Sequence, residues 1–157
     1  MTSTNDHIYS AIIIGAGFGG LGQGAQFVQE GIDDFLILER GNDVGGVWRE
    51  NTYLGAACDT QALVYCYSYF LNLKVSRMFA GQEELQGYLR SMVEEFGLGK
   101  HIHFGQNITA TEWDQDRRLW TVHTADGSEF LTRSVVAAWG QLNEPNIPNF
   151  PGTETFE

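Results

Sequence analysis

The stretch Ala11-Ile12-Ile13-Ile14-Gly15-Ala16-Gly17-Phe18-Gly19-Gly20 decides the fold of this chain. It opens with an apolar run typical of a short buried strand, and its glycines then fit the pattern G-x-G-x-x-G at Gly15, Gly17 and Gly20. In this pattern the first glycine allows a tight turn, the second lets a pyrophosphate approach the backbone at a helix N-terminus, and the third lets that helix pack on the strand. The stretch therefore predicts a dinucleotide-binding turn between a strand and a helix.

The residues that follow complete a βαβ unit. A helical stretch around Gly20–Glu30 stops at Gly31, and the apolar run Phe35–Glu39 predicts a second strand parallel to the first. Glu39 stands 19 residues after Gly20, at the end of this strand, where its carboxylate can accept a hydrogen bond from a ribose hydroxyl. Because the same charge repels a 2′-phosphate, the site suits FAD or NAD rather than NADP.

Two observations leave a purely structural interpretation open. Glycines are common in tight turns, so the loop could be an ordinary βα turn with Glu39 as a solvated strand end. Gly22 and Gly24 also lie inside the expected helix, where each costs about 1 kcal/mol relative to alanine.

The pattern of the remaining chain indicates the α/β class. We expect the first strand over His7–Ile14, an irregular glycine- and aromatic-rich region over Gly41–Phe79, and an amphipathic helix over Gln82–Phe96. An antiparallel meander is predicted by three segments of alternating polarity, Ile108–Asp114, Leu119–Thr124 and Glu129–Arg133, and Ser134–Ala138 predicts a buried strand that returns to the parallel sheet. We therefore expect a Rossmann-like parallel sheet with an inserted antiparallel β-meander.

The composition narrows the classes of function. The chain has 157 residues, 9 Lys+Arg against 20 Asp+Glu and a formal net charge of −11, which disfavours nucleic acid and anionic membranes as partners. The run Ala11–Ile14 is too short to span a membrane, and Met1–Ser10 lacks the basic and apolar regions of a signal peptide. Cys58 and Cys66 are too few for a disulfide framework and lack metal-ligand spacing. We expect a soluble, cytoplasmic chain that forms one domain over residues 1–157 and binds no metal.

A second cluster of motifs narrows the choice between FAD and NAD as the cofactor. It comprises Glu39-Arg40, Gly45-Gly46-Val47-Trp48, Asn51, Tyr53, Gly55, Cys58-Asp59 and Tyr65-Cys66-Tyr67-Ser68-Tyr69-Phe70. In this order and spacing the motifs resemble the N-terminal, FAD-binding part of flavin-containing monooxygenases of the Baeyer–Villiger type. The likeness continues as far as Pro148–Gly152 and so covers nearly all of the chain. Cys58 and Cys66 do not form the C-x4-C pair of flavin disulfide reductases, so that class is disfavoured.

The resemblance implies roles for the matching residues. Gly15, Gly17 and Gly20 would hold the FAD pyrophosphate, Glu39 would bind the adenosine ribose, and Ile108 would offer its backbone to the adenine. Val47 and Trp48 would line the flavin, and Tyr65 would contact it. Asp59 matches the active-site aspartate of the family and is the implied catalytic residue. The implied cofactor-binding set is Gly15, Ala16, Gly17, Phe18, Gly20, Glu39, Arg40, Gly46, Val47, Trp48, Asp59, Tyr65 and Ile108. On residue type alone, Trp48 and Tyr65 could instead be aromatic core, and Asp59 could cap a turn.

The resemblance also implies an activity. Such enzymes use NADPH, FAD and O2 to insert oxygen into a small-molecule ketone or to oxidise a heteroatom. We expect this chain to be the FAD-binding portion, truncated before the NADPH-binding domain and inactive alone. The alternatives are a fragment of an N- or S-oxygenating flavin monooxygenase, or a truncated reading frame that binds no cofactor.

Three features depart from the pattern of the family. Leu54 stands where the family usually has proline, and Thr60-Gln61 replaces a more usual apolar and then proline or acidic pair. Trp139 replaces a small Thr or Ser at a strand end that comes close to the cofactor. We expect its indole either to redirect this loop or to impair the seat of the cofactor.

Overall fold

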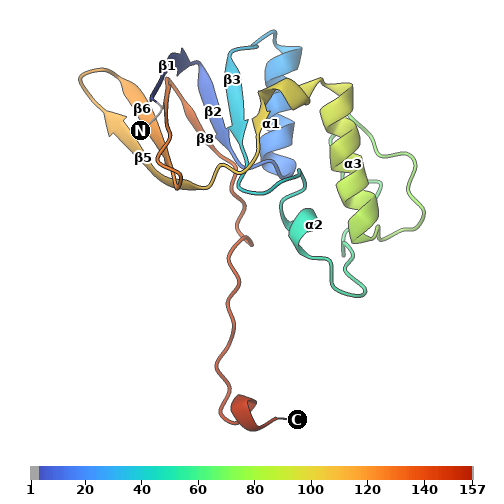
Figure 1. Cartoon of the computed structure of the whole chain (residues 1–157). Coiled ribbons are helices and arrows are strands. Elements are labelled where there is room, and N and C mark those ends of the chain that lie inside the picture. Colours follow the sequence, from blue (N-terminus) through green and yellow to red (C-terminus); the bar gives the residue numbers. More distant parts are fainter. Residues whose placement is uncertain (1–3, 157) are drawn as a thin grey trace.

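Strands β2 and β3 form the centre of the computed structural model, which describes residues 4–156. They belong to a parallel sheet with the strand order β4-β3-β2-β8. The bounds of its strands are Ala11–Ile14 for β2, Phe35–Leu38 for β3, Ile102–His103 for β4 and Val135–Ala137 for β8. Figure 1 shows helices on one side of this sheet and a second, strongly twisted sheet on the other. The predicted α/β class and Rossmann-like parallel sheet are therefore confirmed.

The two faces of the parallel sheet bury alternate residues of the same strands. Ile13 and Ile37 pack against the helical side in the largest apolar cluster. Ile12 and Leu36 point the other way, where they pack with Val122 of the second sheet. A strand that is apolar at every position is the pattern expected for a sheet covered on both faces.

Two of the three α-helices within residues 4–156 were predicted from the sequence. Helix α1 spans Phe18–Gln29, α2 spans Val47–Glu50 and α3 spans Gln82–Glu95, while short 3-10 turns occupy Leu98–His101 and Thr153–Thr155. The α1 and α3 assignments confirm the two predicted helices. The short helix α2 lies inside the region predicted to be irregular, and its single turn is too short to give a sequence period.

The glycines inside α1 are explained by close packing. A Cβ added at Gly22 would lie 2.6 Å from Cε1 of Tyr67, and one at Gly24 would lie 2.9 Å from Cδ1 of Ile37. Both distances are shorter than real carbon–carbon contacts, so α1 gives up helix propensity for close contact with its neighbours.

The second sheet contains the predicted meander and one strand more. Its order is β1-β7-β6-β5, with β1 at Thr4–Tyr9, β7 at Glu129–Thr132, β6 at Leu119–Thr124 and β5 at Ile108–Asp114. The pairings of β5 with β6 and of β6 with β7 are antiparallel, which confirms the meander, whereas β1 pairs parallel with β7.

The prediction of one strand over His7–Ile14 was wrong, because the chain changes sheets at Ser10 and residues 11–14 alone form β2. The amide and hydroxyl of Ser10 both donate to the Asp34 carboxylate, at 3.0 and 2.9 Å, and the Ser10 amide also donates to the carbonyl of Asp34. These bonds fix a break between β1 and β2 that hydrophobic patterning does not reveal. Residues 1–3 and 157 lie outside the described residues, so the parts of the predicted domain (residues 1–157) and of the signal-peptide prediction (Met1–Ser10) that fall on them are not described.

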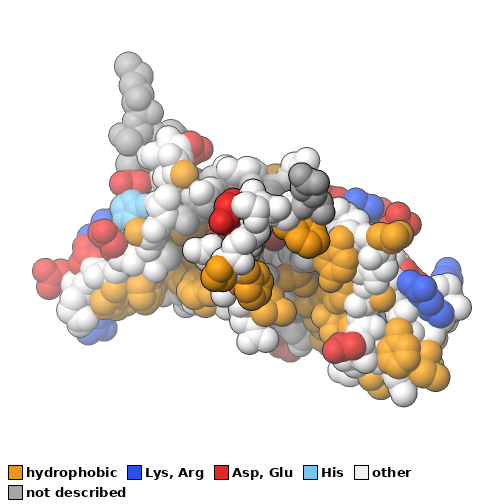
Figure 2. Space-filling view, turned by 90° about the horizontal axis from the view of Figure 1, so that it is seen from below, with side chains coloured by type: hydrophobic (Ala, Val, Ile, Leu, Met, Phe, Trp, Pro, Cys, Tyr) orange, Lys and Arg blue, Asp and Glu red, His pale blue; other side chains and the backbone are white. Residues whose placement is uncertain are grey.

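Beyond β8 the chain leaves the two sheets. Figure 1 shows it running outward as an extended segment that ends in the last 3-10 turn. Several apolar side chains are exposed on this segment and in the irregular region, among them Leu142, Ile147, Leu54 and Leu73, and Figure 2 shows hydrophobic side chains gathered on the underside of the molecule. Within residues 4–156 no helix has both the length and the apolarity needed to cross a membrane.

Candidate functional site

A cavity of about 680 Å³ opens beyond the carboxyl ends of the parallel strands. This is the edge at which open α/β sheets bind their ligands. Its walls come from the glycine loop, the end of β3, the segment around α2, the start of β5 and the residues after β8. The lining includes Gly15, Gly17, Phe18, Glu39, Arg40, Gly46, Val47, Trp48, Arg49, Glu50, Tyr65, Gln106, Ile108, Trp139, Gly140 and Asn143.

The glycine loop has the tight geometry that its sequence predicts. Gly15 adopts a φ of +101°, and a Cβ there would lie 2.7 Å from the carbonyl oxygen of Ala138. A Cβ at Gly20 would lie 1.8 Å from the carbonyl oxygen of Gly15. Gly15 therefore serves the turn, and Gly20 serves the close packing of α1 against the loop.

The N-terminus of α1 faces this cavity without a side chain over it. Gly17 is the N-cap, no side chain caps the helix, and its first turn carries no acidic residue. The first-turn amides of a helix have no intrahelical acceptor, and they carry the positive end of the helix dipole. Opposite lies Gly46 with a φ of +54°, whose Cα would be 3.5 Å from a Cβ at Gly17. The two glycines leave a backbone-lined space suited to an anion.

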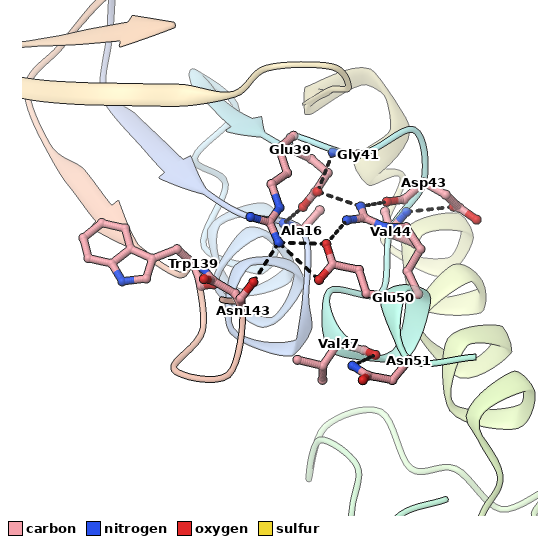
Figure 3. A network of polar contacts seen from close by, with 12 residues as sticks. Ala16, Glu39, Gly41, Asp43, Val44, Val47, Glu50, Asn51, Trp139 and Asn143 are labelled. Carbon is pink, nitrogen blue, oxygen red and sulfur yellow. Dashed lines mark hydrogen bonds and ion pairs between the residues drawn. The ribbon is translucent and has the colours of Figure 1, made fainter. Parts of the chain in front are cut away.

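Glu39 is buried at the end of β3, with only 3% of its surface exposed, yet it lines the cavity. Its Oε2 accepts a hydrogen bond from the amide of Ala16 at 2.7 Å, and its Oε1 accepts one from the amide of Gly41 at 2.8 Å. Figure 3 shows this carboxylate between the two amides. The predicted ribose acceptor therefore also fixes the glycine loop to the end of β3.

Arg49 of α2 supplies the charge partner of Glu39. Its Nη1 donates to Oε1 of Glu39 at 2.6 Å and to the carbonyl of Asp43 at 2.8 Å, while its Nη2 donates to Oε1 of Glu50 at 2.7 Å. Burial alone would lower the pKa of Arg49, but its hydrogen bonds and charge interactions with Glu39 and Glu50 raise it. The guanidinium is thus a fixed cation beside the predicted ribose site.

Arg40 connects the cavity wall to the segment after β8. Its Nη2 donates to Oε1 of Glu50 at 2.9 Å and to the carbonyl of Asn143 at 3.1 Å, and its Nη1 donates to Glu144 at 3.2 Å. The hydrogen bond with Glu50 is the main reason that the pKa of Arg40 is raised. Arg40 therefore holds residues 143 and 144 across the rim of the cavity.

An aromatic wall closes the side of the cavity next to α1. Nε1 of Trp48 donates to the hydroxyl of Tyr65 at 3.1 Å, and the rings of Tyr65 and Phe18 meet edge to face at 4.8 Å. Burial raises the pKa of Tyr65 above its ordinary value. These rings provide an apolar surface of the kind that flat heterocycles pack against.

The structure brings most of the sequence-predicted residues to this cavity. Those that line it are Gly15, Gly17, Phe18, Glu39, Arg40, Gly46, Val47, Trp48, Tyr65 and Ile108. Ala16 and Gly20 lie behind the lining, because Ala16 is fully buried with its amide on Glu39 and Gly20 packs on Gly15. Asp59 is exposed and does not line the cavity.

The indole of Trp139 does not displace the glycine loop. The backbone at Ala138 and Trp139 keeps its close approach to Gly15, while Trp139 is 56% exposed at the rim. Figure 3 shows the indole pointing away from Glu39 and Glu50. The extra bulk is therefore accommodated outside the cradle of backbone amides.

Sequence reasoning missed Arg49 and Glu50. Both stand directly after Gly45-Gly46-Val47-Trp48, in a segment that was interpreted only through its glycines and aromatic residues. Their charge in an otherwise glycine- and aromatic-rich stretch is the signal that could have found them.

Comparisons with known proteins show which family the chain belongs to. Residues 12–157 match the family model described as pyridine nucleotide-disulphide oxidoreductase. The chain belongs to this family. The match does not supply the C-x4-C pair whose absence disfavours the flavin disulfide reductases, because seven residues separate Cys58 from Cys66 and both are free thiols within the described residues.

The relatives found by sequence confirm the resemblance to Baeyer–Villiger monooxygenases. A Baeyer-Villiger monooxygenase of Streptomyces coelicolor is 40% identical over 153 residues, which are 97% of this chain and 29% of the relative. One of Pseudomonas aeruginosa is 41% identical over 145 residues, which are 92% of this chain and 28% of the relative. The chain thus spans less than a third of the length of these curated relatives.

Solved structures of monooxygenases are also similar to this chain. Cyclohexanone monooxygenase from a Rhodococcus species, bound to NADP+, is similar with a TM-score of 0.87 and 32% identity, over 98% of this chain and 30% of that one. The OTEMO protein in complex with FAD and NADP has a TM-score of 0.86 and 29% identity over 98% of this chain and 30% of its own.

Proposed function

We propose that the cavity binds FAD, and that the chain is the FAD-binding portion of an NADPH-dependent monooxygenase that inserts oxygen into ketones. The observation that carries this proposal is the conjunction of an uncapped helix N-terminus, a second glycine facing it and a buried carboxylate one strand over. The names of the relatives and the FAD and NADP of the similar structures support the same function.

The residues fit a flavin dinucleotide in size and chemistry. A volume of about 680 Å³ lies within the range of cofactor sites. The glycine at position 17 leaves the first-turn amides of α1 open to a pyrophosphate, and Glu39 offers an acceptor for the adenosine ribose. Ile108, Val47, Trp48 and Tyr65 all line the cavity. We assign Ile108 to the adenine and the other three to the flavin ring.

When bound, FAD supplies the redox chemistry and the reaction with O2. The residues of this chain hold and shield it. The first-turn amides of α1 would donate hydrogen bonds to the pyrophosphate, and the aromatic wall of Phe18, Trp48 and Tyr65 would shield the ring system from water. Arg40 holds residues 143 and 144 at the rim, which narrows the opening.

Two further parts of the proposal concern the whole protein. We infer that residues 1–157 form one FAD-binding domain and that the NADPH site lies outside it. We also infer that Asp59, whose side chain is exposed, contributes to catalysis together with parts of a longer enzyme. The free thiols of Cys58 and Cys66 fit the reducing conditions of the cytoplasm.

A flavin titration tests the proposal. The purified chain is mixed with FAD, and the flavin absorption and fluorescence are followed to saturation. We expect a saturable spectral shift that the Gly17→Ala variant weakens by at least about tenfold, because a methyl group fills the space for the pyrophosphate. Absence of any shift in the unchanged chain would contradict FAD binding and favour the interpretation as a chain without cofactor.

A further inference from the structure

The two oxygens of Glu39 differ in the hydrogen bonds that they can still accept. Among the described residues, Oε1 accepts from the amide of Gly41 and from Nη1 of Arg49, whereas Oε2 accepts only from the amide of Ala16. A carboxylate oxygen has two lone pairs, so Oε1 is saturated and Oε2 keeps one free. The free acceptor is therefore on the oxygen next to the glycine loop.

Arg49 is what makes the two oxygens different. Its side chain is 14% exposed and that of Glu39 is 5% exposed, so the pair is largely shielded from water. Additional bonds to the carbonyl of Asp43 and to Glu50 fix the plane of the guanidinium. A buried carboxylate held by a rigid, multiply bonded guanidinium cannot rotate without losing several charge-assisted bonds.

The absence of a side chain at Gly41 makes room for the contact between Arg49 and Glu39. A Cβ on Gly41 would lie 1.8 Å from Nη1 of Arg49 and 2.2 Å from its Cζ. Only a residue without a side chain lets the guanidinium lie against the backbone here, while the amide of that residue donates to Glu39. The segment from Gly41 to Arg49 is thus built around one carboxylate oxygen.

We propose that Arg49 is a positioning residue for ribose recognition. By occupying Oε1 together with Gly41, it turns the free acceptor of Oε2 toward the adenosine ribose of the dinucleotide. This proposal rests on the proposed FAD binding, and it assigns Arg49 an action through Glu39 rather than a contact with the cofactor. Arg49 should therefore matter only for ligands that carry the ribose hydroxyl.

The test compares ligands as well as variants. Dissociation constants are measured for FAD and for FAD analogues that lack the adenosine 2′- or 3′-hydroxyl, with the unchanged chain and with Arg49→Met. A second variant, Gly41→Ala, displaces the guanidinium but keeps its charge. Arg90→Met is the matched control, because Arg90 pairs with Asp43 in the same loop without touching Glu39.

We expect both Arg49→Met and Gly41→Ala to weaken the affinity for FAD about tenfold, equivalent to about 1.4 kcal/mol. The affinity for the deoxy analogue that lacks the hydroxyl bound by Oε2 of Glu39 should stay unchanged within about twofold. Arg90→Met should change neither affinity. Equal losses for FAD and for both deoxy analogues, or no loss for FAD, would overturn the role of Arg49. If the unchanged chain binds neither FAD nor the analogues, it is the proposed function that fails, and the two failures are thus distinguished.

Discussion

The carboxylate of Glu39 accepts a hydrogen bond from the amide of Ala16, at 2.7 Å and across 23 residues of sequence. This bond joins the end of β3 to the glycine loop that follows β2. An acid at this position is usually considered only as a partner of the ribose, but here it is also part of the folded loop. The fold of the loop and the proposed binding of the ribose therefore depend on the same side chain.

Removing the charge of Glu39 should destabilise the fold. In Glu39→Gln the largely shielded guanidinium of Arg49 loses its charge partner, and an amide group replaces an oxygen that accepts hydrogen bonds. Breaking a buried ion pair on one side costs roughly 3 kcal/mol, so we expect a loss of that order in the free energy of unfolding. Urea denaturation followed by circular dichroism measures it, and an unchanged midpoint would argue against the buried pair.

The glycines of the loop should separate into structural and binding positions. Gly20→Ala places a Cβ 1.8 Å from the Gly15 carbonyl and should cost about 3 kcal/mol or prevent folding. Gly17→Ala has an ordinary contact at 3.5 Å and a φ of −85°, so its thermal midpoint should stay close to that of the unchanged chain. A midpoint for Gly17→Ala as low as that for Gly20→Ala would contradict this separation.

Alanine should lower the stability of the chain at Gly22 and raise it at Gly87. Alanine at Gly22 meets the ring of Tyr67 at 2.6 Å, and overpacking of this kind costs about 1–3 kcal/mol. Gly87 in α3 has no atom within 4 Å of its added Cβ, so Gly87→Ala should stabilise the chain by about 1 kcal/mol through helix propensity alone. Thermal unfolding of both variants gives the comparison. In a Tyr67→Ala background, the loss caused by Gly22→Ala should disappear.

Acid should weaken the contact between α2 and Arg40. Burial would raise the pKa of Glu50, but its hydrogen bonds to Arg40 and Arg49 outweigh burial and lower it below the usual value of 4.5. The unfolded chain then takes up the proton first as the pH falls, so this stabilisation is full above about pH 4.5 and is lost through the lower folded pKa. We expect Glu50→Gln to lower the thermal midpoint at pH 7 and to approach the unchanged chain at pH values near 3. Glu95→Gln, at an exposed position of α3, is the control and should follow the unchanged chain at both pH values.

Sequence reasoning found the parts of the molecule that depend on local pattern. The βαβ unit, the helix α3 and the meander each carry a clear period, and the glycine loop carries its own steric logic. The break at Ser10 escaped because it depends on Asp34, which approaches only in the folded chain. The role of Arg49 escaped for the same reason, since Glu39 and Gly41 become its neighbours only after α2 turns back toward β3.

The positions of two residues in the folded chain do not follow from the motif alone. Asp59 was predicted beside the cofactor, but it is exposed and outside the cavity lining, so its role stays a prediction about a longer enzyme. Trp139 was expected to redirect the loop or to impair the seat of the cofactor. Its backbone keeps the contact with Gly15, so the loop is not redirected, whereas its effect on the cofactor stays a prediction because it also lines the cavity. Side-chain direction at a loop is a tertiary property that residue type does not fix.

We propose that a flavin dinucleotide binds with its pyrophosphate on the amides at the start of α1. A titration of the ¹⁵N-labelled chain with FAD, followed by amide nuclear magnetic resonance, tests it residue by residue. We predict that the largest saturable shifts belong to the amides of Gly17, Phe18 and Gly46, with smaller shifts around Ile108. Shifts confined to other surfaces, or none at saturating FAD, would contradict the account.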